Sequence, residues 1–282
     1  MSTLPTYFAP MPSSATITAQ PAHRAVAERE LPRGDRAALA PLAGVAADWE
    51  VVYKIAARRE ELFAAFGLVY KAYVRAGLST RHPYRMRVTP YHLLPSTEVF
   101  IAVKQSEVIS TVSLVRDGAL GLPLESVYGP EVAQYRKRGF LVAEVSCLAD
   151  HRQGQRRSVP VVMRLMSLMA QVAKRRGVDQ LLIACHPRHR RFYRHFAAFE
   201  PFGEEKPYRT VCNHPAIAMA LDLSWAPIDH PELYAKFFGT PFPEEVLEYC
   251  PIPDRLRAEL SLAVEASYVG LACSELELLA AG

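Results

Sequence analysis

The most restrictive feature of the sequence lies near its middle, where two apolar strand-like segments flank one amphipathic helix-like segment. The run FLVAEVSCLA (residues 140–149) has strand character throughout, and QLLIAC (180–185) is a second strand. Between them, PVVMRLMSLMAQVAKRRG (160–177) has apolar residues at helical spacing, with Pro160 in the first turn and Gly177 at the end. This order of strand, helix and strand is typical of an α/β fold.

Strands and helices also alternate on both sides of this central unit. DWEVVYKIA (48–56) predicts a strand, and RREELFAAFGLVYKAYVRAG (58–77) predicts a helix. EVFIAVK and EVISTVSLV predict a hairpin that turns at Gln105 and Ser106, a short polar helix ends near Gly139, and AIAMALDL (216–223) is a further strand. We therefore predict an α/β fold with a mixed central sheet flanked by helices.

The two ends of the chain differ from this middle part. Residues 1–45 are rich in Pro, Ala, Ser and Thr without a sustained apolar period, so we expect a flexible, disordered N-terminal arm. Residues 46–223 form the predicted α/β domain. Residues 224–282 contain several prolines and helix-like segments, and we expect a helical C-terminal extension that caps the domain or mediates self-association.

Composition excludes several classes of protein. The formal net charge is only +4, so a nucleic-acid partner is not expected. The 5 cysteines are widely spaced and form no CxxC pair, which argues against a disulfide framework or a structural zinc site and favours a reducing compartment. No apolar run reaches the roughly 18 residues of a membrane span, and no secretory signal is recognisable. We expect a cytoplasmic protein without an integral membrane segment.

Glu144 is a carboxylate in the middle of the otherwise apolar strand 140–149. Strand alternation places Glu144 with Val142, Ser146 and Leu148 on one face, and Val145 and Cys147 on the other. Burial of an unpaired carboxylate costs several kcal/mol or forces it to protonate. Glu144 must therefore meet a cation, water or a substrate, and the sequence leaves a structural ion pair and a functional role open.

Two basic segments follow the two central strands. DHRQGQRRS (150–158) precedes a helix, whose N-terminus can bind phosphate with the help of Arg152, Arg156 and Arg157, although a solvated loop is the alternative. CHPRHRRFYRHF (185–196) contains three histidines, of which His189 and His195 lie about 120° apart on a helix. That geometry argues against a metal site, so we expect no metal there.

One continuous segment resembles the core of the Gcn5-related N-acetyltransferase (GNAT) superfamily. It runs from Glu144 through the Arg-rich turn and the helix ending in KRRG to ACHP and RFYRHFAAFEPFG. Within it, the sequence is most similar to the N-acyl amino acid synthases, which are related to the acyl-homoserine-lactone autoinducer synthases. The resemblance covers roughly residues 48–223 and includes VYKAYV in the first helix.

Two departures from the related patterns refine what the resemblance implies. The acetyltransferase loop Q/R-x-x-G-x-G/A aligns with Gln155–Pro160, where both glycines are missing, and this is similar to synthases that take acyl groups from a carrier protein. The autoinducer synthases carry E-x-S-R on the central strand. This chain retains Glu144 and Ser146 but has Cys147 in place of the arginine, which argues against an S-adenosylmethionine substrate.

The resemblance implies an acyltransferase site that contains Glu144 as the base and Tyr193 as a possible general acid. Backbone N–H groups at a bulge of the central strand would stabilise the oxyanion. The acyl donor would contact Ser146, Cys147, Leu148, Arg152, Arg156, Arg157 and Ser158. The amine substrate would contact Tyr73, Arg85 and Arg87, the last two from the loop 78–97, which we expect to form a lid or the edge of the amine site.

The expected reaction is the transfer of a long-chain fatty acyl group from an acyl-carrier-protein or CoA thioester to the amine of an amino acid or a similar primary amine. No metal or organic cofactor is expected beyond the thioester co-substrate. The apolar faces at 62–73 and at Met163, Met166 and Met169 could line an acyl slot or simply form core. A homoserine-lactone synthase and a catalytically degenerate binding module remain as alternatives, and an acidic carrier protein could meet Arg188, Arg190, Arg191 and Arg194.

Overall fold

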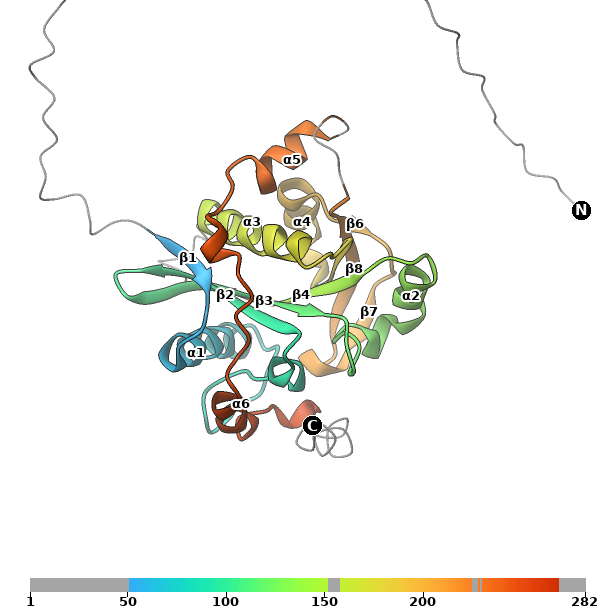
Figure 1. Ribbon diagram of the computed structural model, residues 1–282. Coiled ribbons are helices and arrows are strands. Elements are labelled where there is room, and N and C mark those ends of the chain that lie inside the picture. Colours follow the sequence, from blue (N-terminus) through green and yellow to red (C-terminus); the bar gives the residue numbers. More distant parts are fainter. Residues whose placement is uncertain (1–50, 152–157, 225–227, 229, 269–282) are drawn as a thin grey trace, which may run out of the picture. The chain divides into compact units, whose positions relative to one another are not determined.

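A computed structural model describes residues 51–151, 158–224, 228 and 230–268. Its central feature is an 8-stranded sheet with the order β1-β2-β3-β4-β5-β8-β6, in which β7 also pairs with β8 (Figure 1). The strands are β1 (Val52–Ile55), β2 (Thr97–Lys104), β3 (Glu107–Arg116), β4 (Val142–Asp150), β5 (Gln180–Cys185), β6 (Glu200–Pro201), β7 (Lys206–Tyr208) and β8 (His214–Asp222). All pairs are antiparallel except β4 with β5, so the sheet is mixed, as predicted.

Helices cover both faces of this sheet (Figure 1). They are α1 (Arg59–Arg75), α2 (Glu125–Lys137), α3 (Val159–Arg175), α4 (Arg190–Ala197), α5 (Pro231–Phe238) and α6 (Asp254–Ser261). In Figure 1, α3 lies on one side of the sheet and α1 on the other. The predicted α/β fold class is confirmed.

Local sequence explains the ends of the main elements. The apolar residues Leu62, Phe66 and Val69 of α1 are buried at spacings of four and three. Gly77 follows that helix at φ 73°, a left-handed conformation that costs glycine little. The predicted hairpin turn at Gln105 and Ser106 is confirmed, and both residues have positive φ, as a two-residue turn between β2 and β3 requires.

The methionine-rich helix α3 belongs to the core. Met166 and Met169 are fully buried in one cluster with residues of β2, β3, β4 and β5, and Met163 packs against that cluster. None of these methionines lines the cavity described below. The acyl-slot interpretation of this helix therefore lacks support, and the alternative of simple core packing accounts for it.

The segment after β8 is integrated into the domain. Phe237, Phe242 and Leu247 belong to the same hydrophobic cluster as α3 and the sheet, and α5 packs on α3. On the other face, Leu256 and Leu260 of α6 pack against Leu62 and Phe66 of α1. The expected N-terminal arm, residues 1–45, lies outside the described residues.

Much of the loop 78–97 is core. Residues 86–94 are buried, and they include a single 3-10 turn, η1 (Pro90–Leu93). His92 is part of this turn, and burial lowers its pKa to about 3. The second half of this loop thus supports the sheet, while Leu78 and Arg87 reach the cavity.

Candidate active site

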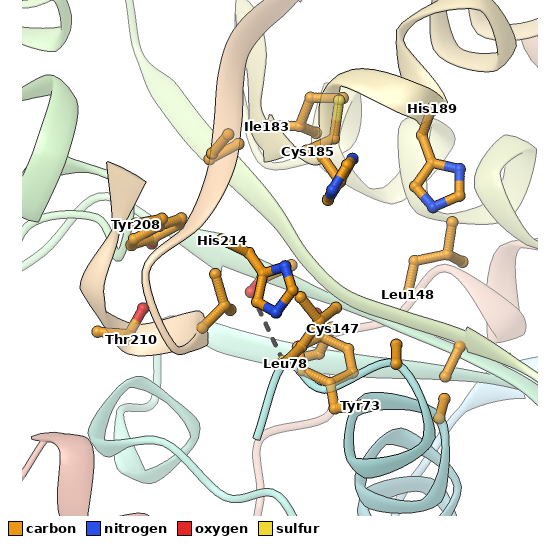
Figure 2. Close-up of a pocket in the computed structure, with 18 of the residues that line it drawn as sticks. Tyr73, Leu78, Cys147, Leu148, Ile183, Cys185, His189, Tyr208, Thr210 and His214 are labelled. Atoms are coloured by element: carbon orange, nitrogen blue, oxygen red, sulfur yellow. Dashed lines mark hydrogen bonds between the residues drawn. The ribbon is translucent and has the colours of Figure 1, made fainter. Parts of the chain in front are cut away.

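A cavity opens where β4 and β5 stop pairing. Their parallel register covers only Val142–Glu144 and Gln180–Leu182, and beyond it the two strands carry residues that line a cavity of about 540 Å³. Helix α1, the start of β8 and residues 208–211 complete its walls. Figure 2 shows this space with Tyr208 and Thr210 on one side and His189 and Leu148 on the other.

A β-bulge shapes the β4 wall of the cavity. Ser113 of β3 pairs with Ser146 and Thr111 pairs with Ala149, so Cys147 and Leu148 together oppose Val112. Cys147 has φ 54°, a strained backbone conformation for a residue with a side chain. Such a bulge leaves backbone N–H groups of β4 outside the regular ladder and next to the cavity.

The bulge corrects the predicted side-chain alternation of β4. Strict alternation places Leu148 on the face of Glu144 and Cys147 on the face of Val145. In the structure, Leu148 packs against the same cluster as Val145, whereas Cys147 packs with Val69 and Ala149 on the side of α1. The predicted faces of β4 were wrong after Ser146, because the extra residue in the bulge shifts the alternation of side chains by one position.

Glu144 is buried at the cavity without a cation beside it. It is 3% exposed, lines the cavity, and makes no ion pair with any described residue. Its Oε2 accepts a hydrogen bond of 2.7 Å from the backbone N–H of Leu124, at the N-terminus of α2, whose dipole favours the anion. Burial nevertheless dominates and raises the pKa of Glu144 to about 8.

Arg87 lies in the same wall, but it already has partners. Its Nη1 donates to the carboxylate of Glu265, its Nη2 donates to the carbonyl oxygen of Thr210 at 3.3 Å, and its guanidinium lies 4.5 Å from the ring centroid of Tyr73. Arg87 is 2% exposed, and within the described residues its Nε has no hydrogen-bond partner. Glu265 thus balances its charge and leaves one donor nitrogen unused.

Aromatic hydroxyls surround this part of the cavity. Tyr73, Tyr193, Tyr208 and Tyr268 all line it, and they come from α1, α4, β7 and the C-terminal segment. Burial raises the pKa of Tyr268 to about 12 and raises the pKa values of Tyr73 and Tyr208 as well. These three side chains are therefore neutral hydrogen-bond donors near pH 7.

Two thiols line the cavity, and both are protonated. Burial raises the pKa of Cys147 and raises that of Cys185 to about 12. A thiol needs to be a thiolate in order to attack a thioester. The raised pKa values therefore do not favour either cysteine as a nucleophile.

Comparison with known proteins agrees with this geometry. The model of the family described as N-acyl amino acid synthase FeeM matches residues 64–222, which is more than half of the chain. The chain belongs to this family. A solved structure of FeeM, an N-acyl amino acid synthase from uncultured soil microbes, has 28% sequence identity and a TM-score of 0.56, covering 67% of this chain and 96% of that one.

Membership of the N-acyl amino acid synthase family makes the protein an acyltransferase enzyme with a GNAT-like fold. The AHL synthase LasI shares that fold, with a TM-score of 0.51 and 15% identity over 69% of this chain and 98% of LasI. No curated protein matches the sequence.

The cavity gathers most of the residues expected from the family resemblance. Of the described ones, it brings together Tyr73, Arg87, Glu144, Ser146, Cys147, Leu148 and Tyr193. Arg85 instead lies in a separate hollow beside α1 and the hairpin turn, with Lys71 and Ser106. Ser158 is exposed at the start of α3, and Arg152, Arg156 and Arg157 lie outside the described residues.

Several cavity residues were missed by sequence reasoning, namely Tyr208, Thr210, His214 and Tyr268. Tyr268 follows the family-matched region by more than forty positions, so neither its spacing nor the resemblance indicated it. His186, His189 and His214 lie at the cavity, with ring centroids 6.4 and 6.2 Å from that of His186. The described part of the chain contains no group of three or more His, Cys, Asp or Glu suited to hold a metal ion.

Two surface features complete the description. Arg188, Arg190, Arg191 and Arg194 are all exposed, so they form a basic rim on and before α4. Among the described helices, none has the length and apolar character needed to cross a membrane.

Proposed function

We propose that the enzyme transfers a long-chain fatty acyl group from an acyl-carrier-protein or CoA thioester to the amine of an amino acid. The observation that carries this proposal is the buried carboxylate of Glu144, which has no cation partner among the described residues and lies where the two central strands separate. A thioester can enter between separated strands, and the carboxylate can accept a proton from an amine in the same cavity.

Glu144 is the proposed general base. An ammonium group has no lone pair for attack, so one proton must leave before the amine nitrogen bonds to the thioester carbon. The pKa of about 8 for Glu144 is close to that of an ordinary α-amino group, which is about 8. Proton transfer between the two groups is then nearly balanced in free energy, directly or through one water.

The β4 bulge is the proposed oxyanion site. When the amine attacks, the carbonyl oxygen gains negative charge, and the C–S bond breaks as the amide C–N bond persists. Backbone N–H groups around Cys147 and Leu148, at the bulge in the cavity wall, would stabilise that charge. The leaving sulfur departs as a thiolate, and Tyr193, which lines the same cavity, is the proposed source of a proton for it.

The acyl donor would enter from the side of β4 and α3. Ser146, Cys147 and Leu148 would contact the thioester arm, and Ser158 with Arg152, Arg156 and Arg157 would meet its phosphate at the start of α3. The exposed basic rim would face an acidic carrier protein. Of the two arginines expected near the acceptor, Arg87 lines the cavity and is the one retained here.

The test is direct product analysis. Purified protein is incubated with a long-chain acyl-carrier-protein thioester, or the matching acyl-CoA, and a pool of the twenty amino acids, and N-acyl products are identified by mass spectrometry. We expect N-acyl amino acids with the wild type and about 10²- to 10⁴-fold less product with Glu144→Gln. Formation of a lactone from added S-adenosylmethionine, or thioester binding without turnover, would contradict the proposal.

A further inference from the structure

The cavity is lined in part by a group of buried hydrogen-bond donors. We call it the donor cluster, and it consists of Arg87, Tyr208, Thr210 and Tyr268. They come from the segment before η1, the end of β7, the 3-10 turn η3 (Arg209–Val211) and the 3-10 turn η5 (Ala266–Tyr268). Each is at most 6% exposed, although each lines the cavity.

Arg87 contributes one unused donor to this cluster. Two of its three guanidinium nitrogens donate to Glu265 and to the Thr210 carbonyl oxygen, whereas Nε–H has no partner within the described residues. Glu265 does not line the cavity, so it holds Arg87 from behind. Buried donors are rarely left unpaired, because each costs the free energy of its lost hydration. An acceptor atom of a ligand would satisfy Nε.

The three hydroxyls complete the cluster. The Thr210 hydroxyl is buried and interacts with the Tyr208 and Tyr268 phenols, whose pKa values are raised by burial and lowered by hydrogen bonding to Thr210. The cluster therefore offers a cationic N–H and several O–H donors together, a combination that suits an anion with several lone pairs.

Glu144 lines the same cavity and supplies a carboxylate that can accept a hydrogen bond or a proton. The pKa values of Tyr208 and Tyr268 are raised by burial and further by the nearby Glu144 carboxylate, so the base and the phenols share one end of the cavity. Donors next to a carboxylate base match a molecule that carries a carboxylate and an amine on one carbon. We infer that the donor cluster binds the carboxylate of an α-amino acid whose amine contacts Glu144. This inference rests on the proposed function and specifies its acceptor.

Part of this subsite lies outside the family-matched region. Residues 263–268 follow α6, and they are attached to the domain by the backbone bond from Glu265 N–H to the Val88 carbonyl oxygen (3.0 Å) and by the bridge between Val88 and Val264. The family match ends at residue 222. The C-terminal segment thus supplies both the Arg87 partner and one phenol, so the inferred subsite includes residues beyond the family-matched region.

The experiment compares an amino acid with its own carboxamide. The amino acid with the highest kcat/KM in the twenty-member pool is assayed beside its primary α-amide, using one acyl thioester at saturation, for the wild type, Tyr268→Phe and Thr210→Val. We expect the wild type to prefer the acid about 100-fold. Each variant should raise KM for the acid about 10-fold, the cost of one lost hydrogen bond to a charged group, while KM for the amide and kcat change less than about 2-fold.

Controls separate the possible failures. Tyr234→Phe removes a phenol from α5, away from the cavity lining, and should behave as the wild type. Thermal melting of each variant monitors folding, and because two independent positions are tested, misfolding of one leaves the other informative. If the wild type forms no N-acyl amino acid at all, the proposed function fails. If it forms them but uses acid and amide equally, or if both variants weaken the two acceptors alike, the carboxylate subsite alone is overturned.

Discussion

Two buried glutamates of the same sheet show how differently a fold can treat one side chain. Glu98 on β2 is 1% exposed, and it pairs with Arg176 at 3.0 Å and with Arg116 at 3.9 Å. Glu144 on β4 is 3% exposed and accepts a backbone hydrogen bond, but it meets no cation among the described residues. Only Glu144 lines the cavity.

This difference supports a structural role for Glu98 and underlies the proposed role of Glu144 as a general base. The charge of Glu98 is compensated permanently, so that residue can be buried and stays fixed. The charge of Glu144 is compensated only in part, by an N–H at the end of α2, and burial raises its pKa to about 8. A group that is costly to ionise in the free protein can be stabilised by an ammonium substrate. Such perturbed groups in clefts are typical of catalytic sites.

The strongest test of this contrast is the activity of Glu144→Gln. Gln has nearly the shape of a protonated Glu but cannot accept a proton, so we expect N-acyl product formation to fall about 10²- to 10⁴-fold, the usual contribution of a general base. Initial rates by mass spectrometry measure this effect. Glu259→Gln, an exposed glutamate paired with Arg59, is the matched control and should keep full activity. Unchanged rates in Glu144→Gln would remove this residue from the mechanism.

The second test is the dependence of stability on pH. The pKa of Glu144 rises from 4.5 to about 8 on folding, because burial penalises the charged form. The stabilisation that the Glu144 carboxyl group contributes is therefore fully present below pH 4.5 and is lost as pH rises to about 8. Within this range the free energy of unfolding should fall by up to about 1.4 kcal/mol per pH unit. Urea unfolding between pH 4.5 and 9 should show this loss in the wild type.

The same experiment on Glu144→Gln provides the comparison. The variant has no titrating group at this position, so the difference in unfolding free energy from the wild type should grow in favour of the variant as pH rises. Parallel curves for the two proteins would show that the Glu144 carboxyl titrates at its ordinary pKa in the fold.

For Glu98→Gln we expect a smaller change in the free energy of unfolding, and it is a loss of stability. Loss of this charge leaves Arg176 and Arg116 without their partner, and removal of one member of a buried pair is destabilising. Both arginines retain some contact with solvent, with side chains 12% and 27% exposed, so we expect a loss of about 2 to 3 kcal/mol. Urea unfolding at pH 7 measures it.

The kinetic constants of the folded Glu98→Gln variant complete that test. Because Glu98 does not line the cavity, kcat and KM per folded molecule should match the wild type. A selective fall in kcat at unchanged stability would mean that the two glutamates do not divide structure and chemistry in this way.

The sequence predicted the fold better than it predicted the site. Periodicity located α1, α3, the β2–β3 hairpin and β4, because each repeats its apolar residues at the spacing of its own backbone. The same reasoning identified Glu144 as unusual, but it could not choose between an ion pair and a reactive role. That choice depends on which arginines, distant in the sequence, lie next to the carboxylate in the fold. Glu98 has two such neighbours, from β3 and from the end of α3.

Other parts of the site depend on tertiary contacts that no local pattern contains. The bulge at Cys147 and Leu148 reverses the faces of β4, and it results from pairing with β3. Tyr268 reaches the cavity, and Glu265 pairs with Arg87 in the cavity wall, from a segment whose composition resembles an ordinary surface helix. Arg85 and Arg87 are two positions apart in the sequence, yet they line different hollows.

The smallest effect is expected for Tyr193→Phe, and it tests whether acid–base chemistry is concentrated on Glu144. Tyr193 is buried at the cavity, where its phenol could protonate the departing sulfur. A thiol has an ordinary pKa of about 8.5, so a thiolate is a good leaving group and gains little from an acid. We expect kcat to fall less than about 10-fold for a thioester donor, with acyl-CoA and acyl-carrier-protein affected alike. A fall as large as that of Glu144→Gln would instead show that the collapse of the tetrahedral intermediate limits the rate and that Tyr193 delivers its proton.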